Sequence, residues 1–348
     1  MFNVHDFFSN VSDMNIPIRL DAGQPDITVH KGIIDHTVNS LYNGETGYTK
    51  SIGIDELREK IANFENVKKE EIVVGSGSKI LLTSVISNYD KIGIVSPHWQ
   101  AYEKAALRLS NEIKIIKTTL NNNWVLDFDE SDIDLLVLNY PNNPTGKILD
   151  KNQIKEIIDF CRDNDIKILA DEVYKDIVFK DFTTIKEMYD EVITVRGFSK
   201  LYSMTGFRLG YAIGDKKDID VIKNFIEITT NSVPVFIQKG GCKAIDLHDD
   251  IKEQVKRTYE KRKKIAVREL DENIFDFAVP DGTFYIFIKT GTDGVTFTNK
   301  LLEKGVAVFP GAAFGDYDDF IRVSLVSDRI KKGIEIVNEV GREVLDEK

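Results

Sequence analysis

A lysine that could form a covalent bond with a carbonyl compound stands near the middle of the chain. Lys200 directly follows Ser199, and Arg208 comes eight residues later, close to Gly206 and Gly210. A lysine amine held where a strand meets a loop can form a Schiff base, and a guanidinium nearby can hold a phosphate. Lys200 is therefore a candidate for Schiff-base formation, with Arg208 as a candidate phosphate ligand, although most Ser-Lys pairs lie on a solvated surface and the prediction depends on the other segments.

A carboxylate is expected at the edge of a ligand-binding crevice. Asp171 follows the apolar run 166–170, which has the pattern of a buried strand, and Tyr174 comes three residues later. Ligands of open α/β sheets bind outside the carboxyl ends of the strands. Asp171 is therefore a candidate for direct contact with a bound ligand.

Two loops that follow predicted strands have residues typical of ligand-binding turns. Residues 75–78 read Gly-Ser-Gly-Ser and precede a helix that begins near Lys79, where backbone N–H groups favour an anion. Residues 139–146 read Asn-Tyr-Pro-Asn-Asn-Pro-Thr-Gly, and the prolines and glycine fix a rigid turn. Helix capping and turn chemistry also explain each loop alone, so the prediction depends on the other segments.

In their order along the chain, these segments resemble the class I/II aminotransferases, which are fold type I enzymes dependent on pyridoxal 5'-phosphate (PLP). The resemblance covers about residues 20–325 and includes Gly-Thr-Phe-Tyr at 282–285 and Phe-Pro-Gly-Ala-Ala-Phe-Gly at 309–315. It implies PLP as the cofactor and no metal. It also implies an α/β fold, with a mostly parallel central sheet, helices on both faces and a smaller α+β domain.

The resemblance assigns the catalytic roles to three residues. Lys200 is expected to form the Schiff base (the internal aldimine) with the cofactor and then to act as a general base. Asp171 is expected to keep the pyridine nitrogen protonated, and Tyr174 to bond the phenolic oxygen. Asn143 is expected to contact the same oxygen and the substrate, and Trp99 to stack on the cofactor ring.

The cofactor phosphate is expected to lie at the start of a helix, among small, hydroxyl and basic residues: Gly77, Ser78, Lys79, Ser199 and Arg208. Gly197 departs from the family pattern, because Ser or Thr often contacts the phosphate at this position. One hydroxyl contact should therefore be missing. Tyr48 is expected to reach the phosphate of a neighbouring subunit, which implies a homodimer.

The resemblance also implies the substrates. Gly23 is expected to touch the substrate, and Arg322 to grip its α-carboxylate in the bidentate manner that suits a guanidinium. The implied reaction moves an amino group from an L-amino acid to a 2-oxo acid by a ping-pong mechanism. Within the family, the chain resembles prokaryotic aspartate and aromatic aminotransferases, and Lys79 is placed to read a side-chain carboxylate.

Three alternatives stay open at the level of sequence. Histidinol-phosphate aminotransferase is a near relative, because the chain length and the Gly-x-Gly loop also fit it. A carbon–sulfur lyase or a decarboxylase uses the same cofactor residues, since the bond that breaks depends on an angle that sequence does not fix. A transcription regulator would need an added DNA-binding module, which we do not expect because the motifs begin by about residue 20.

The elements that position these residues follow an alternation of short apolar runs and amphipathic stretches. This alternation predicts a mostly parallel sheet covered on both faces. The expected strands are 72–74, 91–95, 113–117, 135–139, 166–170, 192–195 and 209–213. The expected helices between them include 54–63, 79–87, 101–109 and 151–164.

The pattern changes after Asn231 to that of a smaller α+β unit. Helices are expected near 233–247, 250–273, 295–304 and 328–345, and strands near 284–288, 306–309 and 320–325. We predict an N-terminal segment 1–30 that joins the small domain, a large PLP-binding domain 31–248 and a small C-terminal domain 249–348.

The composition of the chain argues against nucleic acid and anionic membranes as its main partners. The 348 residues include 46 Lys and Arg against 57 Asp and Glu, a net charge of −11, which disfavours nucleic acid and anionic membranes. The basic residues within 256–264 are expected on a solvated helix face. The two cysteines predict buried thiols in a reducing cytoplasm, and no apolar run approaches the ~20 residues that cross a bilayer.

Overall fold

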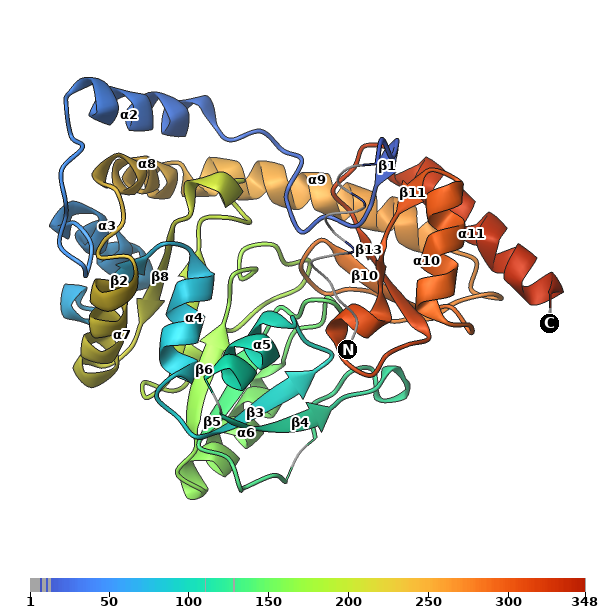
Figure 1. Ribbon diagram of the computed structural model, residues 1–348, viewed down its shortest axis with the longest axis horizontal. Coiled ribbons are helices and arrows are strands. Elements are labelled where there is room, and N and C mark those ends of the chain that lie inside the picture. Colours follow the sequence, from blue (N-terminus) through green and yellow to red (C-terminus); the bar gives the residue numbers. More distant parts are fainter. Residues whose placement is uncertain (1–6, 8–10, 12–13, 110, 128, 348) are drawn as a thin grey trace.

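The computed structural model describes residues 7, 11, 14–109, 111–127 and 129–347. These residues form a seven-stranded central sheet, a four-stranded second sheet and the helices around them (Figure 1). The rest of the expected N-terminal segment (residues 1–6, 8–10 and 12–13) lies outside the described part of the chain.

The central sheet is mostly parallel, as predicted. Its strands lie in the order β2-β8-β7-β6-β5-β3-β4, and only β8 runs antiparallel to its two neighbours. The carboxyl ends of the other strands therefore meet at one edge of the sheet. The strands are β2 (Ile72–Gly75), β3 (Lys91–Ser96), β4 (Glu112–Lys117), β5 (Leu135–Asn139), β6 (Lys167–Asp171), β7 (Ile193–Gly197) and β8 (Gly210–Ile213).

Helices cover both faces of this sheet, because successive residues of a strand point to opposite sides. On β5, Leu135 and Val137 pack with α4, α5 and α7, whereas Leu136 and Leu138 pack with α6. The helices around the sheet are α2 (Lys31–Tyr42), α3 (Asp55–Glu65), α4 (Ser78–Ile86), α5 (Ala101–Arg108), α6 (Lys151–Asp163), α7 (Lys216–Thr229) and α8 (Val235–Asp246).

The second sheet is antiparallel and lies beside the C-terminal helices. Its order is β12-β13-β10-β9, and the long helix α9 runs from the α8 end of the molecule toward it (Figure 1). The strand β1 (Ile18–Arg19) pairs in parallel with β11 (Val306–Ala307). The other elements are β9 (Asp276–Phe277), β10 (Tyr285–Lys289), β12 (Phe309–Pro310), β13 (Phe320–Ser324), α9 (His248–Glu269), α10 (Gly294–Glu303) and α11 (Ile330–Asp346).

Several elements differ from the sequence prediction. The strand expected at 306–309 is two short strands that join different sheets. Helix α8 begins at Val235, after Pro234, because the fixed φ of proline favours the start of a helix and disfavours its interior. Helices α2 and α7 and the short strands β1 and β9 were not predicted.

Cys161 and Cys242 are both buried and free, as the sequence predicts. Among the described residues, no helix is both long and apolar enough to cross a membrane.

Candidate active site

Most of the predicted site residues lie at the carboxyl edge of the central sheet. Residues 76–79 follow β2, Trp99 follows β3, Asn143 follows β5, Asp171 ends β6, and Lys200 follows β7. Arg208 precedes β8, which runs in the opposite direction, so it reaches the same edge. The topology thus gathers residues that are up to 132 positions apart in sequence, from Ser76 to Arg208.

Lys200 is half-buried, and its amine points toward the N-terminal segment. The Nζ atom donates a hydrogen bond to the carbonyl oxygen of Gly23 at 2.6 Å and lies 5.6 Å from the centre of the Tyr174 ring. Burial, and then the charge of Arg322, lowers the pKa of Lys200 to about 8. A substantial fraction of this amine is therefore neutral near physiological pH, as a nucleophile or a base requires.

Asp171 is buried at the last position of β6. Its Oδ2 accepts a hydrogen bond from the hydroxyl of Tyr102 at 2.6 Å, and Oδ1 accepts one from the N–H of Val173 at 3.2 Å. Burial raises the pKa of Asp171 to about 6 even though both hydrogen bonds oppose this shift. A cationic partner placed here would stabilise the ionised carboxylate.

Arg322 is buried at the centre of the second sheet and faces the same space. Its Nη1 donates to Oδ1 of Asn143 at 2.9 Å, and its Nη2 donates to the carbonyl oxygen of Asp21 at 2.6 Å. Among the described residues, its Nε has no hydrogen-bond partner. Within the described part of the chain this buried guanidinium has no carboxylate partner, so it is suited to binding an anionic ligand.

Aromatic rings surround the guanidinium of Arg322. The Cζ atom lies 4.2 Å from the ring centre of Tyr285, 4.9 Å from that of Phe314 and 5.1 Å from that of Phe309. These rings exclude water from the charge and strengthen its interaction with any bound carboxylate.

The start of α4 has the features of a phosphate site. Gly77 is the N-cap residue with φ 84°, and no side chain of the described chain caps the helix, so its first N–H groups can bind an anion. Arg208 packs against this turn so closely that a Cβ atom on Gly77 would lie 2.4 Å from its Nη2. A Cβ atom on Gly197 would meet that of Ser78 at 3.9 Å, an ordinary van der Waals contact, so a small side chain would fit at this position.

Lys79 and Trp99 lie together beside this turn. The Nζ of Lys79 is 5.2 Å from the Trp99 ring centre, and Trp99 meets Tyr102 edge-on with centroids 5.6 Å apart. Burial, Arg208 and Lys104 all lower the pKa of Lys79. The cation therefore stands among other cations, at a point where a further anionic group would be stabilised.

Among the described residues, no hydrogen bond, ion pair or ring contact joins Tyr48 or Ser199 to this cluster. Tyr48 is 92% exposed and lies between α2 and α3. Ser199 is half-buried next to Lys200.

Sequence reasoning missed three contributors to the site. Tyr102 donates to Asp171, the backbone carbonyl of Asp21 accepts from Arg322, and Tyr285 hydrogen-bonds Tyr174 at 2.9 Å. Tyr102 lies in the first turn of α5, and no local signal marks its hydroxyl as a partner of Asp171. No local signal marks a backbone carbonyl such as that of Asp21.

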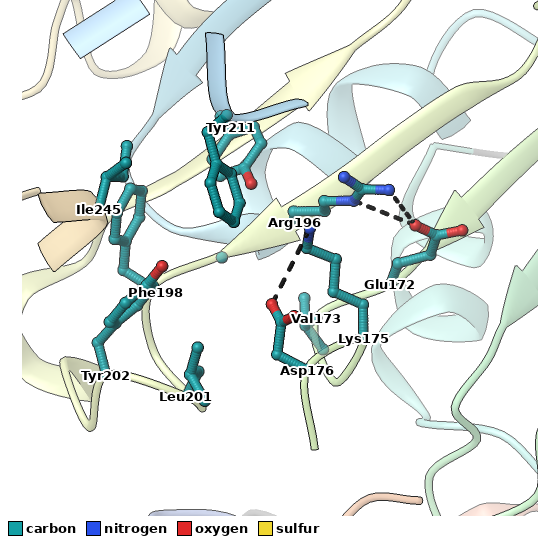
Figure 2. Close-up of a pocket in the computed structure, with 12 residues that line it drawn as sticks. Glu172, Val173, Lys175, Asp176, Arg196, Phe198, Leu201, Tyr202, Tyr211 and Ile245 are labelled. Carbon is teal, nitrogen blue, oxygen red and sulfur yellow. Dashed lines mark hydrogen bonds and ion pairs between the residues drawn. The ribbon is translucent and has the colours of Figure 1, made fainter. Parts of the chain in front are cut away.

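The residues behind these strand ends form a second cluster of buried charges. Arg196 of β7 pairs with Glu65 of α3 and with Glu172, its Nη2 lying 2.7 Å from Oε2 of Glu172. Figure 2 shows Arg196 beside Glu172, with Lys175 and Asp176 lining the same small cavity. The charges of Glu65, Glu172 and Arg196 are thus matched within the protein.

Residues 15–336 match the family model of the class I and II aminotransferases. The chain is 48% identical over 339 residues to the aspartate aminotransferase of Thermococcus kodakarensis, which covers 97% of this chain and 93% of that protein. It is 34% identical over 351 residues to a probable aspartate aminotransferase of Methanocaldococcus jannaschii, which covers 93% of each.

Solved structures have the same fold. The aspartate aminotransferase of Thermotoga maritima superimposes with a TM-score of 0.91 at 27% identity, covering 99% of this chain and 97% of that one. An aromatic aminotransferase of Pyrococcus horikoshii superimposes with a TM-score of 0.88 at 28% identity, covering 99% of each chain.

Proposed function

Because this chain belongs to the class I and II aminotransferases, we propose that its amino donor is L-aspartate. It is a PLP-dependent enzyme that transfers an amino group between amino acids and 2-oxo acids. The comparisons do not favour histidinol phosphate as the substrate, or lyase and decarboxylase chemistry. The choice of donor and the role of each residue are the proposal.

The placement of Lys79 carries the choice of aspartate. Its ammonium stands beside Trp99, and the positive charges of Arg208 and Lys104 help to lower its pKa, whereas Arg322 stands among aromatic rings. Two separate cations suit a substrate with two carboxylates. The relatives named above as aspartate aminotransferases support this choice.

The residues at the sheet edge fit PLP. The uncapped start of α4 and Arg208 would hold its phosphate, Asp171 its pyridine nitrogen, Tyr174 and Asn143 its phenolic oxygen, and Trp99 one face of its ring. When bound, PLP withdraws electrons from the α-carbon of the substrate and so makes its proton acidic. The hydrogen bond from Tyr102 holds Asp171 in position for this contact.

Lys200 would move the proton. Its pKa of about 8 leaves the amine partly neutral, so it can accept a proton from the α-carbon and return it elsewhere. The carbonyl oxygen of Gly23 lies 2.6 Å from Nζ and orients the amine. Because this oxygen has no formal charge, it does not form an ion pair with the amine. Arg322 would orient the α-carboxylate so that the α-hydrogen faces Lys200.

Steady-state kinetics with L-aspartate, L-alanine and L-phenylalanine would test the proposal, with 2-oxoglutarate as acceptor. Aspartate is expected to have the highest kcat/KM. Lys79→Met should lower kcat/KM for aspartate by about 10- to 100-fold, the loss of one charged hydrogen bond. The same variant should keep kcat/KM for alanine within about 2-fold of the native value, and Lys79→Arg should retain most activity with aspartate. Equal losses for both donors would reject Lys79 as the reader of the second carboxylate.

We also propose a homodimer formed through α2. One face of α2 packs on α8 through Ile33, whereas apolar side chains on its other side are exposed: Ile34, Val38, Leu41 and Tyr42. Exposed Tyr48 follows this helix and would then reach the partner's phosphate site. Sedimentation velocity should show a dimer for the native chain and monomers for Val38→Lys.

A further inference from the structure

Tyr285 is a buried residue that touches both halves of the proposed site. It begins β10, is 1% exposed, and contacts Tyr174 through its hydroxyl and Arg322 through its ring. The roles of Tyr174 and Arg322 are part of the proposed function, and the present inference rests on that function. The function of Tyr285 itself is not explained by core packing alone, because its polar atom faces the site.

The ring of Tyr285 fixes one face of the Arg322 guanidinium. Two edges of the guanidinium are held by Asn143 and by the carbonyl of Asp21, and the ring centre of Tyr285 lies 4.2 Å from Cζ. Arg322 lies directly opposite Phe287 in the sheet, so Tyr285 is its diagonal neighbour on the same face. The ring therefore sets the tilt of the plane that would meet a carboxylate.

The hydroxyl of Tyr285 controls the direction in which Tyr174 can donate. The two oxygens are 2.9 Å apart, and either could be the donor. Burial raises the pKa of both phenols, so both hydroxyls keep their protons at neutral pH.

A bound phenolic oxygen would fix the direction of this hydrogen bond. A tyrosine hydroxyl has one proton, so Tyr174 can donate to a ligand only while it does not donate to Tyr285. Tyr285 would then donate to Tyr174 and keep the buried oxygens paired. Gly23 lies against the other side of the Tyr285 hydroxyl, because a Cβ atom on Gly23 would be 3.0 Å from the hydroxyl oxygen.

We propose that Tyr285 is a positioning residue with two separable functions. Its hydroxyl directs the proton of Tyr174 toward the cofactor, and its ring holds Arg322 for the substrate carboxylate. The two functions depend on different atoms of one side chain, so two substitutions can remove them in turn. Tyr285→Phe removes the hydroxyl and keeps the ring, whereas Tyr285→Leu removes both.

The experiment compares these two variants in the holoenzyme. One readout is the pH midpoint of the absorbance change of bound PLP, together with the Kd of PLP for the apoprotein. The other is the KM for L-aspartate and the Kd of the unreactive dicarboxylate succinate. Thermal unfolding of each variant reports any general loss of structure.

Tyr285→Phe is expected to raise the pH midpoint by about 0.5 unit, because Tyr174 becomes a weaker donor to the phenolate. It should weaken PLP binding by about 3-fold and leave the Kd of succinate within about 2-fold. Tyr285→Leu should show the same shift in midpoint and also raise the Kd of succinate by about 5-fold. A purely structural role would not separate the two readouts.

Tyr174→Phe provides the reference. If it leaves the pH midpoint unchanged, the proposed role of Tyr174 fails and the inference fails with it. If Tyr174→Phe raises the midpoint but Tyr285→Phe does not, the inference alone is overturned. It is also overturned if both Tyr285 variants weaken succinate binding equally.

Discussion

Buried charged residues lie on both sides of the ends of strands β6 and β7. Those on one side have partners of opposite charge, whereas those on the other side have neutral partners. On one side, burial alone would raise the pKa of Glu65, yet Arg196 and Lys175 lower it to about 2. On the other side, burial raises the pKa of Asp171 to about 6 and lowers that of Lys200 to about 8. Asp171 and Glu172 are consecutive residues, so a single step along the chain separates the two regions.

This difference distinguishes charges that stabilise the fold from charges that await a ligand. In the Glu65, Arg196 and Glu172 cluster, each buried charge has a close partner of opposite sign. At the proposed active site, Asp171 is held by a neutral phenol, Lys200 by a carbonyl and Arg322 by an amide and a carbonyl. Unmatched buried charges cost stability, and PLP and a dicarboxylate would supply the missing partners.

Lys200→Ala tests the active-site side and should have the largest effect. We expect kcat/KM to fall by about 10⁴-fold or more, because the variant lacks both the nucleophile and the base. The free energy of unfolding should stay the same or rise, since a poorly solvated cation is removed. Enzyme kinetics and urea unfolding measure the two effects. A large loss of stability in this variant would contradict the distinction.

Arg196→Met tests the other side and should have the reverse effect. Two buried carboxylates lose their partner, which should lower the free energy of unfolding by about 3–5 kcal/mol. The folded fraction should keep its catalytic rate within about 10-fold. Lys264→Met is the matched control, because Lys264 pairs with Glu260 on the surface and is 70% exposed. A similar stability for both variants would show that the buried cluster adds nothing.

The pH dependence of stability should differ in sign between Asp171 and Glu65. The folded pKa of Asp171 is raised to about 6 from 3.8. Its contribution to the free energy of unfolding is therefore fully present below pH 3.8 and is lost as the pH rises through 6. Asp171→Asn should therefore stabilise the apoprotein at pH 8 by up to about 3 kcal/mol, with no gain below pH 4.

Glu65→Gln is the counterpart. The folded pKa of Glu65 is lowered to about 2 from 4.5, so its contribution is present above 4.5 and lost as pH falls toward 2. This variant should be less stable than the native chain at pH 7 and should approach it toward pH 2. Urea unfolding at several pH values checks both variants, and two curves of the same sign would refute the comparison.

Gly197→Ser should have the smallest effect. A Cβ atom at this position would meet its nearest neighbours at 3.8 to 3.9 Å, so a serine fits next to Ser78. Its hydroxyl could donate to the phosphate and tighten PLP binding by about 1 kcal/mol, or several-fold. Fluorescence titration of the apoprotein with PLP measures the change. Gly197→Ala, which has no hydroxyl, is the control and should not improve binding.

The central sheet was predictable because its signals are local. The strand 135–139 matches β5, and the other expected strands of this sheet agree with the structure to within a residue or two at each end. Continuous apolar runs of this length are typical of buried parallel strands. The strand expected at 306–309 was wrong as a single unit, because the division into β11 and β12 depends on pairing with β1 and β13.

The sequence by itself determined the family, the cofactor and the residue types available for chemistry. Those conclusions depend on short segments in a fixed order, and each segment can be read without knowing where the others lie. Lys200, Asp171 and Arg322 could therefore be singled out from their neighbours in the chain.

Only the tertiary structure decided which of these charges are matched. The pKa of a buried group depends on the partners that folding brings within a few ångströms, and these partners come from distant parts of the chain. Glu65 meets Arg196 from 131 positions away, and Tyr285 meets Tyr174 from 111 positions away. Consecutive residues such as Asp171 and Glu172 thus acquire different functions because a strand turns them to opposite sides.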